Sequence, residues 1–212
     1  MKNIYIIFFL IIISFAFVKC GTDTKSMKDN AGKEYKTVKI GKQIWMAENM
    51  DYKASNGSWC YDEDSLYCEK YGRLYTWETA CTVCPDGWHL PSAEEWEDLI
   101  KYLSTENVNT CLAFTNEELV LSLISETGWD KKTYQSNKVY NKSGFAALPG
   151  GYRYYDGKYY NLGSMGIWWS SSKLNISEDV YRCVYFINNK TVGRDFVSAW
   201  YGASVRCVKD SI

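Results

Sequence analysis

Cys84-Pro-Asp-Gly-Trp-His-Leu-Pro-Ser92-Ala-Glu-Glu-Trp96 joins a cysteine, a Pro/Gly turn and the start of a helix in one short segment. Ser92 and Glu95 have the spacing of a capping box, in which each side chain satisfies a free backbone N–H at a helix start. Past this cap, four apolar residues recur at the helical spacing i, i+3, i+4 and i+7: Trp96, Leu99, Ile100 and Leu103. The segment therefore predicts a helix over 93–104 with one buried face, entered from a corner that Cys84 can crosslink.

The composition indicates one domain with an aromatic core. The 212 residues include 9 Trp, 18 Tyr and 8 Phe, and such rings either bury large areas or, where exposed, bind other molecules. The net charge of −1 and the lack of a Lys/Arg run argue against a nucleic-acid partner, because phosphate binding needs a concentrated basic face. The sequence has no glycine-rich phosphate loop, histidine cluster or nucleophile elbow, so we expect neither a cofactor nor an enzyme.

Residues 1–19 have the pattern of a signal peptide, because Lys2 precedes an apolar run that is shorter than the ~20 residues of a membrane span. Two cleavage sites fit. Phe17-Val-Lys-Cys20-Gly21 is a loose bacterial lipobox that would make Cys20 the acylated first residue, although Lys19 stands where a small residue is usual. Ser14-Phe-Ala16 is a small-x-small site, after which an ordinary signal peptidase would release a secreted protein.

The Cys-Gly pair directly after the apolar run, followed by polar residues, favours the lipoprotein. We therefore expect a lipid on Cys20 that anchors the protein in the membrane, at the bacterial cell surface or outer membrane. The mature chain would consist of a polar, flexible tether over 20–33 and a single domain over 34–212.

Eight cysteines are present, at positions 20, 60, 68, 81, 84, 111, 183 and 207. In an exported chain their default use is in disulfides. If Cys20 carries lipid, 8 − 1 = 7 remain and at least one is unpaired, whereas cleavage after Ala16 keeps the count even. Parity thus favours the cleavage site that the layout of the segment disfavours.

Two cysteine pairs are close in sequence. Cys60 and Cys68 predict a local disulfide; the acidic run 62–64 between them is also compatible with a calcium loop, but it lacks the ligand spacing and glycine of an EF-hand. Cys81 and Cys84 have C-x-x-C spacing, yet a redox or zinc site would need a thioredoxin-like setting or a second ligand pair. We therefore expect Cys81 and Cys84 to form structural disulfides with different partners.

The remaining sequence predicts early helices followed by strands. Helices are predicted over 71–80, 93–104 and 116–126, the last capped by Thr115 and ended by Gly128, with a loop over 53–70. Strand hairpins are predicted over 35–46, over 152–160 with a type I′ turn at Asp156-Gly157, and over 180–196 with a turn at 188–190. A strand over 166–172 would point Trp168 and Trp169 to opposite faces, and a closing strand spans 202–209. This order of elements is typical of an α+β domain.

Six segments carry a resemblance to a known family: Tyr35-Lys-Thr-Val-Lys-Ile-Gly-Lys-Gln-Ile-Trp-Met-Ala-Glu-Asn49, Tyr71-Gly-Arg-Leu-Tyr-Thr-Trp77, the segment 84–96 quoted first, Gly144-Phe-Ala-Ala-Leu-Pro-Gly-Gly-Tyr-Arg153, Trp168-Trp-Ser-Ser171 and Ser204-Val-Arg-Cys-Val-Lys-Asp210. In this order they resemble the Fibrobacter succinogenes major paralogous domain, over about residues 31–210. Proteins of that family are bacterial and exported, are often lipoproteins, and have no known molecular function.

That family in turn resembles the C-type-lectin-like fold. Trp77-x-x-Ala80 leading to Cys84 is similar to the fold's first helix and anchoring cysteine, and Val205-Arg-Cys207 is similar to its last strand. The resemblance implies a single domain with two or three N-terminal helices packed on antiparallel strands and hairpins. It also implies a Cys84–Cys207 bridge, worth roughly 4–5 kcal/mol in the chain-entropy model. The Glu-Pro-Asn and Trp-Asn-Asp triplets of calcium-dependent lectins do not occur, so sugar binding by that route is not expected.

Recognition of another molecule is the function that the residues favour. Seven aromatic residues in the C-terminal third could face a glycan or a partner protein at the cell surface: Tyr152, Tyr154, Tyr155, Tyr159, Tyr160, Trp200 and Tyr201. The alternative for these rings is that half of them pack the core while the others stand on the surface without a partner.

Two other functions stay open from the sequence. The protein could be a structural or pilus-associated surface subunit. It could also be a cysteine-dependent oxidase of the formylglycine-generating type, whose fold is similar, with Cys111 or Cys183 as the thiol. His89, the only histidine, is expected to have a structural role rather than that of a general base.

The lipobox predicts that the mature protein begins with an acylated Cys20. Mass spectrometry of the N-terminal peptide should find the mass of the acyl chains on Cys20. An unacylated N-terminus at Phe17 would instead establish the ordinary signal-peptidase site.

Overall fold

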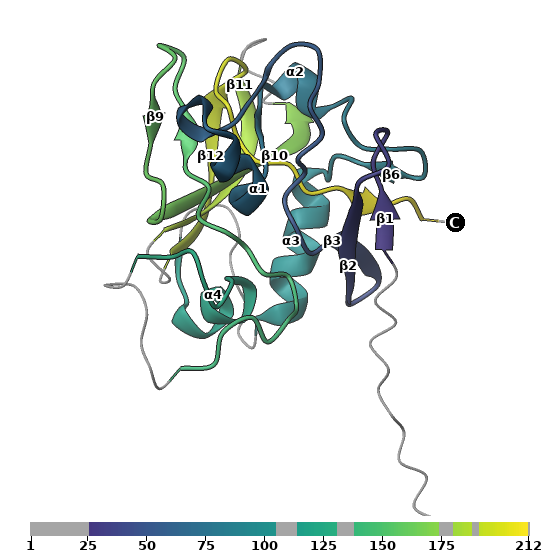
Figure 1. Cartoon of the computed structure of the whole chain (residues 1–212). Helices are drawn as coiled ribbons and strands as arrows, with labels where there is room; N and C mark the ends of the chain where they lie inside the picture. Colours follow the sequence, from purple (N-terminus) through teal and green to yellow (C-terminus); the bar gives the residue numbers. More distant parts are fainter. Residues whose placement is uncertain (1–25, 105–113, 131–137, 174–179, 188–190, 212) are drawn as a thin grey trace, which may run out of the picture.

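The computed structural model describes residues 26–104, 114–130, 138–173, 180–187 and 191–211, which form a mixed α+β arrangement around two antiparallel sheets (Figure 1). The first sheet has the order β1 (Ser26–Lys28), β2 (Glu34–Ile40), β3 (Gln43–Met46), β13 (Val208–Lys209), β6 (Trp88–His89). The second has the order β10 (Met165–Lys173), β11 (Val180–Ile187), β12 (Thr191–Ser198), β7 (Phe114–Thr115).

Shorter elements complete the described structure. Two-stranded sheets are formed by β4 (Ser58–Trp59) with β5 (Leu74–Tyr75) and by β8 (Tyr152–Arg153) with β9 (Tyr159–Tyr160). The helices are α1 (Ser65–Tyr71), α2 (Trp77–Ala80), α3 (Ala93–Leu103) and α4 (Glu117–Leu123), with a 3-10 turn at Tyr61–Glu63.

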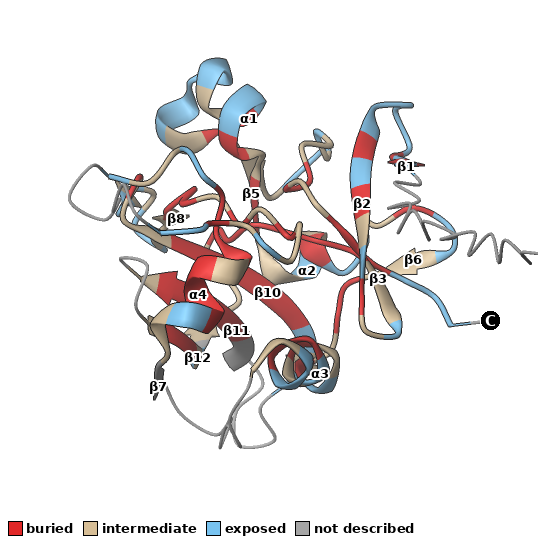
Figure 2. Cartoon of the chain, turned by 90° about the horizontal axis from the view of Figure 1, so that it is seen from below, coloured by how far each residue is buried: buried red, intermediate tan, exposed pale blue. Residues whose placement is uncertain are grey.

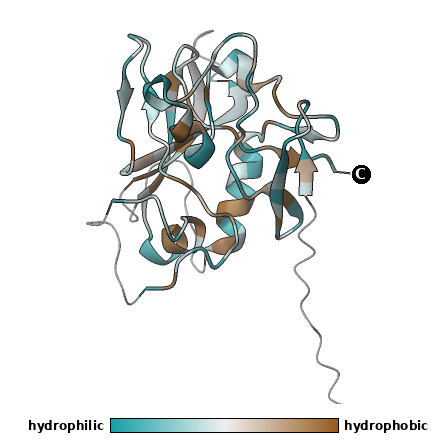
Figure 3. Cartoon of the chain, in the orientation of Figure 1, coloured by the Kyte–Doolittle hydropathy of each residue, from teal (hydrophilic) through white to brown (hydrophobic). Residues whose placement is uncertain are grey.

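Helix α3 has the predicted cap and the predicted buried face. The Glu95 N–H donates to Ser92 Oγ at 3.2 Å, and the Ser92 N–H donates to Glu95 Oε2 at 2.8 Å. Trp96, Leu99 and Ile100 are buried where α3 packs on β10 and β11, and Figure 2 shows the helix buried on one side and exposed on the other. Figure 3 shows hydrophobic residues on α3 and α4. The periodic pattern was sufficient here because it is local.

The predicted helix over 71–80 is wrong. Gly72, with φ of +76°, ends α1, and a Cβ at this position would lie 2.8 Å from the carbonyl oxygen of Met50. The chain then pairs β5 with β4, and only Trp77–Ala80 is helical, capped by Thr76. The predicted loop over 53–70 is therefore also wrong, since it contains β4 and α1. The pairing partner of β5 lies elsewhere in the sequence, so the local pattern did not indicate it.

Helix α4 is shorter than predicted and has a different cap. Asn116, rather than Thr115, accepts the Leu119 N–H at 2.9 Å. The helix ends at Leu123 because Ile124 turns extended and bridges to Ala147, so Gly128 is not its C-cap.

The predicted tether is wrong for its second half. Ser26–Lys28 forms β1 at the edge of the first sheet, paired with β2, and Met27 and Asp29 are buried. Burial of the Met27 side chain stabilises this added strand. The predicted signal segment and Cys20 lie outside the described residues.

The hairpin over 152–160 exists, but its turn is not type I′. The Tyr154 N–H donates to the Lys158 carbonyl at 2.8 Å, and the Gly157 N–H donates to the Tyr154 carbonyl at 3.0 Å. Three residues therefore form the loop, with Gly157 at φ +88° and Asp156 at negative φ. This is the pattern of a type I turn followed by a left-handed glycine.

Strand β10 separates two hydrophobic cores. Trp168 packs in a core with Trp45 and Trp96, whereas Trp169 packs in the other with Tyr75. The predicted opposite orientation of the two tryptophans is thus confirmed, and Figure 2 shows β10 buried along most of its length. The predicted hairpin of β11 and β12 is also present, although its turn at 188–190 lies outside the described residues. The predicted closing strand is regular only at β13; before it, 202–204 makes isolated bridges to Arg153, Tyr75 and Trp168.

Arg206 is a fully buried cation. Its guanidinium donates to the carbonyl oxygens of Met46, Phe145 and Ala146 and, at 2.9 Å, to Asn49 Oδ1. Burial lowers the pKa of Arg206 to about 9, while Glu48 raises it, so the group is charged at neutral pH. Because an unsatisfied buried charge is very costly, these contacts fix the closing segment against the 145–146 turn and β3.

Asn49 connects this cation to two further segments. Its Oδ1 also accepts the Trp168 indole N–H at 2.9 Å, and its amide donates to the Tyr71 carbonyl at 2.8 Å. Beside this network the Cys84–Cys207 disulfide joins the 84–96 segment to the closing segment, and Cys60–Cys68 closes a local loop. Five of the six resemblance segments therefore meet at Asn49 and Arg206, and the Cys84–Cys207 bond attaches the sixth.

Replacing Asn49 by Ala should lower the free energy of unfolding by roughly 3 kcal/mol, because Trp168 and Arg206 would each keep a buried donor without a partner. Urea denaturation followed by tryptophan fluorescence measures this change. The matched control is Asn56→Ala, at an exposed site, which should change stability by less than about 0.5 kcal/mol. Equal stability of the two variants would show that the network is not required.

Candidate functional site

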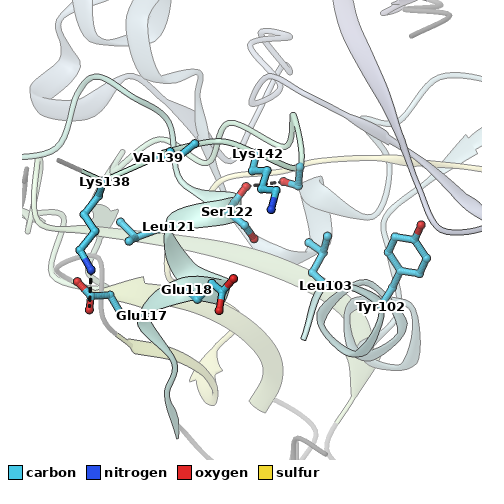
Figure 4. Close-up of a pocket in the computed structure, with 10 residues that line it drawn as sticks. Tyr102, Leu103, Glu117, Glu118, Leu121, Ser122, Lys138, Val139 and Lys142 are labelled. Atoms are coloured by element: carbon cyan, nitrogen blue, oxygen red, sulfur yellow. Dashed lines mark hydrogen bonds and ion pairs between the residues drawn. The ribbon is translucent and has the colours of Figure 1, made fainter. Parts of the chain in front are cut away.

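Hollows large enough for a ligand open on the surface of the described structure. The first, of about 670 Å³, lies between the end of α3, α4 and residues 138–143 (Figure 4). Its polar lining is mostly flexible and already partly paired, since Lys138 lies 3.6 Å from Glu117. Exposed lysines and glutamates of this kind give weak, easily screened interactions, so this hollow is the weaker candidate.

The second hollow, of about 540 Å³, is here termed the aromatic cleft. It is lined by residues of four separate segments, namely Asn56, Gly57, Trp59, Thr76, Glu78, Thr79, Arg153, Tyr155 and Trp200. The first three precede α1, the next three begin α2, and the last three come from the β8–β9 hairpin and the loop after β12. Its volume is within the roughly 300–1,000 Å³ of small-molecule sites.

One wall of the cleft is an arginine stacked on an indole. The Arg153 guanidinium carbon lies 4.1 Å from the centre of the Trp59 ring, a cation–π contact. Glycine at position 202 allows the two backbone segments to approach, because a Cβ there would lie 2.9 Å from the Cβ of Arg153. Two backbone hydrogen bonds between Arg153 and Gly202, of 2.8 and 2.9 Å, fix this wall.

A second part of the cleft is formed by polar groups at the start of α2. The Thr76 hydroxyl donates to the Thr79 hydroxyl at 2.9 Å, and Thr79 donates to the Asn56 carbonyl at 3.2 Å. These hydroxyls are satisfied within the protein. The side chains of Asn56 and Glu78 are exposed at the cleft.

The rim of the cleft carries two exposed rings. Trp200 is 66% exposed and Tyr155 is 63% exposed. The Tyr155 ring is supported from behind by Tyr154, at 4.1 Å between centres. Large aromatic surface left in water on a folded scaffold is typical of a binding surface.

The predicted aromatic set is largely brought together. Five of the seven rings contact one another around the hairpin: Tyr152, Tyr154, Tyr155, Tyr160 and Tyr201. Tyr152 and Tyr201 stack with centres 6.0 Å apart and planes at 15°. Burial and the neighbouring Tyr154 raise the pKa of Tyr201, so the Tyr201 hydroxyl is uncharged at neutral pH.

Two members of the predicted set lie apart from this cluster. Tyr159 packs against Tyr61 at 5.2 Å and donates to Glu63, away from the other five. Trp200 lines the same cleft as Tyr155, which belongs to the cluster. Sequence reasoning missed Trp59, Glu78 and Arg153, because they come from segments assigned to a loop, a helix and a strand with no sign of their proximity.

The family of the chain is established by a match that covers most of its length. The model of the Fibrobacter succinogenes major domain matches residues 38–209. The chain belongs to this family. Neither the curated proteins nor the solved structures that were compared with it include a match. Within the described residues of this Fibrobacter succinogenes major domain, no helix is long and apolar enough to cross a membrane.

The cysteines of this Fibrobacter succinogenes major domain divide into crosslinked and free ones. Cys84 pairs with Cys207, but Cys81 is free, so the predicted disulfide at Cys81 is wrong within the described chain. Burial raises the pKa of the Cys81 thiol to about 11, and burial together with Asp195 raises that of Cys183 to about 12. A nucleophilic thiol needs a lowered pKa, which neither has. Cys111 lies outside the described residues.

The acids of the predicted calcium alternative have structural contacts. Asp64 accepts the Leu66 N–H as the cap of α1, and Glu63 accepts the hydroxyl of Tyr159. Among the described residues no cluster of three or more His, Cys, Asp or Glu side chains could hold a metal ion.

His89 lies between two carboxylates. Its Nδ1 is 2.6 Å from Asp210, and its Nε2 is 2.9 Å from Glu95, the acid of the α3 capping box. Burial lowers the pKa of His89, but hydrogen bonds donated to Asp210 and Glu95 raise it more, so the net pKa is above the ordinary value. The protonated ring donates to both acids and thereby links the C-terminal end of the fold to the start of α3.

His89→Gln should destabilise the domain in mild acid and much less in mild base. Because the pKa of His89 is higher in the folded state, its stabilisation is complete below about pH 6.5 and is lost as the pH rises through the raised value. At this half-exposed site the effect should be at most about 1 kcal/mol.

Thermal unfolding of the wild type and His89→Gln at several pH values measures the effect, with Lys42→Gln, at an exposed lysine, as a control. A difference between wild type and His89→Gln that does not vary with pH would contradict the assignment of charge to His89.

Proposed function

We propose that this domain is a non-catalytic recognition module outside the cytoplasm, held at the bacterial surface by a lipid on Cys20, which binds a glycan or a partner protein. The observation that carries the proposal is the pair of rings at the aromatic cleft, Tyr155 and Trp200, both about two-thirds exposed. Such rings supply much of the binding energy at protein and ligand interfaces.

The disulfides support the extracellular part of the proposal. Cys60–Cys68 and Cys84–Cys207 are expected to persist only in an oxidising compartment. A rigid, crosslinked scaffold also suits recognition, because binding residues that are already ordered lose little entropy when a ligand arrives.

The proposal extends to the architecture and to the absence of catalysis. A C-type-lectin-like domain is supported by the Cys84–Cys207 bridge, which ties the segment before α3 to the last strand. A binding role rather than an oxidase is supported by the raised pKa values of Cys81 and Cys183.

The double variant Tyr155→Ala/Trp200→Ala should lose at least about tenfold in affinity for envelope material of the producing bacterium, because both exposed rings would be gone. Binding of the purified, fluorescently labelled mature protein to isolated envelopes measures this. The control, Leu66→Ala/Tyr102→Ala, removes two side chains that are as exposed, at 68% and 65%, but lie outside the cleft. Equal binding by the double variant and the wild type, with both folded by circular dichroism, would overturn the proposal.

A further inference from the structure

We infer that the aromatic cleft binds a neutral pyranose unit of a glycan, held by ring stacking and hydroxyl hydrogen bonds without a metal ion. The inference rests on the proposed function, since it names the ligand class of the same rings. It concerns the nine residues that line the cleft, all within the described chain.

The charges in the cleft favour an uncharged ligand with hydroxyl groups. One lining side chain is an acid, Glu78, and one is a base, Arg153, and neither forms an ion pair with another described residue. A carboxylate only accepts hydrogen bonds and a guanidinium only donates them. A sugar hydroxyl does both, whereas an ionic ligand would meet one like charge at this short range.

The arginine in particular has unused hydrogen-bonding capacity. Its Nε is buried and has no hydrogen-bond partner, while the guanidinium carbon lies 4.1 Å from the centre of the Trp59 ring. The desolvation of this group is therefore only partly compensated within the protein. A hydroxyl that reaches one of the outer nitrogens of Arg153 would add a charge-assisted hydrogen bond.

The rings at the rim suit the apolar face of a pyranose. Arg153 lies over the Trp59 ring, whereas Tyr155 and Trp200 are the strongly exposed rings of the cleft. Carbon-bound hydrogens of a sugar face pack on aromatic rings, while its hydroxyls at the edge reach polar groups. Asn56 and Glu78 provide such groups in the same cleft.

The polar side chains are placed so that few of them must reorganise. Thr76 and Thr79 satisfy one another and fix the carbonyl of Asn56, and the Arg153–Gly202 hydrogen bonds fix the other wall. Preorganisation of this kind lowers the cost of binding a small ligand. A peptide rich in proline and aromatic residues would use the rings equally well, but it would leave Glu78 and Arg153 without matched partners.

Binding of defined probes tests the inference. Maltohexaose, cellohexaose, mannohexaose and chitohexaose serve as neutral glycans, hexagalacturonate as an acidic one, and decaproline as a peptide. Titration followed by tryptophan fluorescence and calorimetry, with and without EDTA, measures each affinity. At least one neutral glycan should bind equally well in both conditions.

Variants then locate the site. Trp200→Ala should weaken binding of that glycan about tenfold or more through loss of stacking. Glu78→Gln should weaken it about fivefold, because a charged acceptor becomes a neutral amide. Tyr102→Ala and Glu69→Gln, at exposed sites outside the cleft, should leave it unchanged.

Other outcomes overturn the inference in distinguishable ways. Binding of no neutral glycan, or binding that EDTA abolishes or that Trp200→Ala leaves intact, overturns it. If only decaproline or hexagalacturonate binds in a manner that depends on Trp200, the ligand class is wrong but the recognition function remains. If, in addition, the envelopes bind the Tyr155→Ala/Trp200→Ala variant normally, the proposed function is overturned as well.

Discussion

The buried cation of Arg206 is the constraint on which the described structure depends. A guanidinium in the core needs an acceptor in each direction, and these come from Met46, Asn49 and the 145–146 turn. No single secondary-structure element could supply them all. The closing segment must therefore lie against β3 and against that turn at the same time. Cys207, the residue after Arg206, forms a disulfide with Cys84 and thereby fixes the segment before α3 at the same place.

The same segment leads directly to the aromatic cleft. Three and four residues before Arg206, Ala203 pairs with Tyr75 and Gly202 pairs with Arg153. The wall formed by Arg153 and Trp59 is therefore joined through four residues of backbone to the Arg206 network. Loss of order in the Arg206 network would reach the cleft along this short extended segment. The stability of the core and the geometry of the site are therefore coupled.

Features with a local cause could be predicted from the sequence, and features with a distant cause could not. The capping box and buried face of α3 follow from spacing within one helix, and the opposite faces of Trp168 and Trp169 follow from alternation within one strand. The helix predicted over 71–80 failed because Gly72 packs closely on the 49–50 backbone. The cleft could not be predicted for the same reason. Trp59, Glu78 and Arg153 become neighbours only through the pairing of β4 with β5 and of Arg153 with Gly202. Its two most exposed rings, Tyr155 and Trp200, were nevertheless among the seven aromatic residues that the sequence suggested as facing a ligand.

The physical setting explains why two large rings can remain in water on this fold. Exposed apolar surface does not itself stabilise the folded state, so the scaffold must be stable without it. Two buried tryptophans on β10, in separate cores, together with the crosslink across the chain supply that stability elsewhere. Tyr155 and Trp200 are then not needed for folding, and substitution there tests binding without the confounding loss of structure that follows from mutation of Asn49 or Arg206.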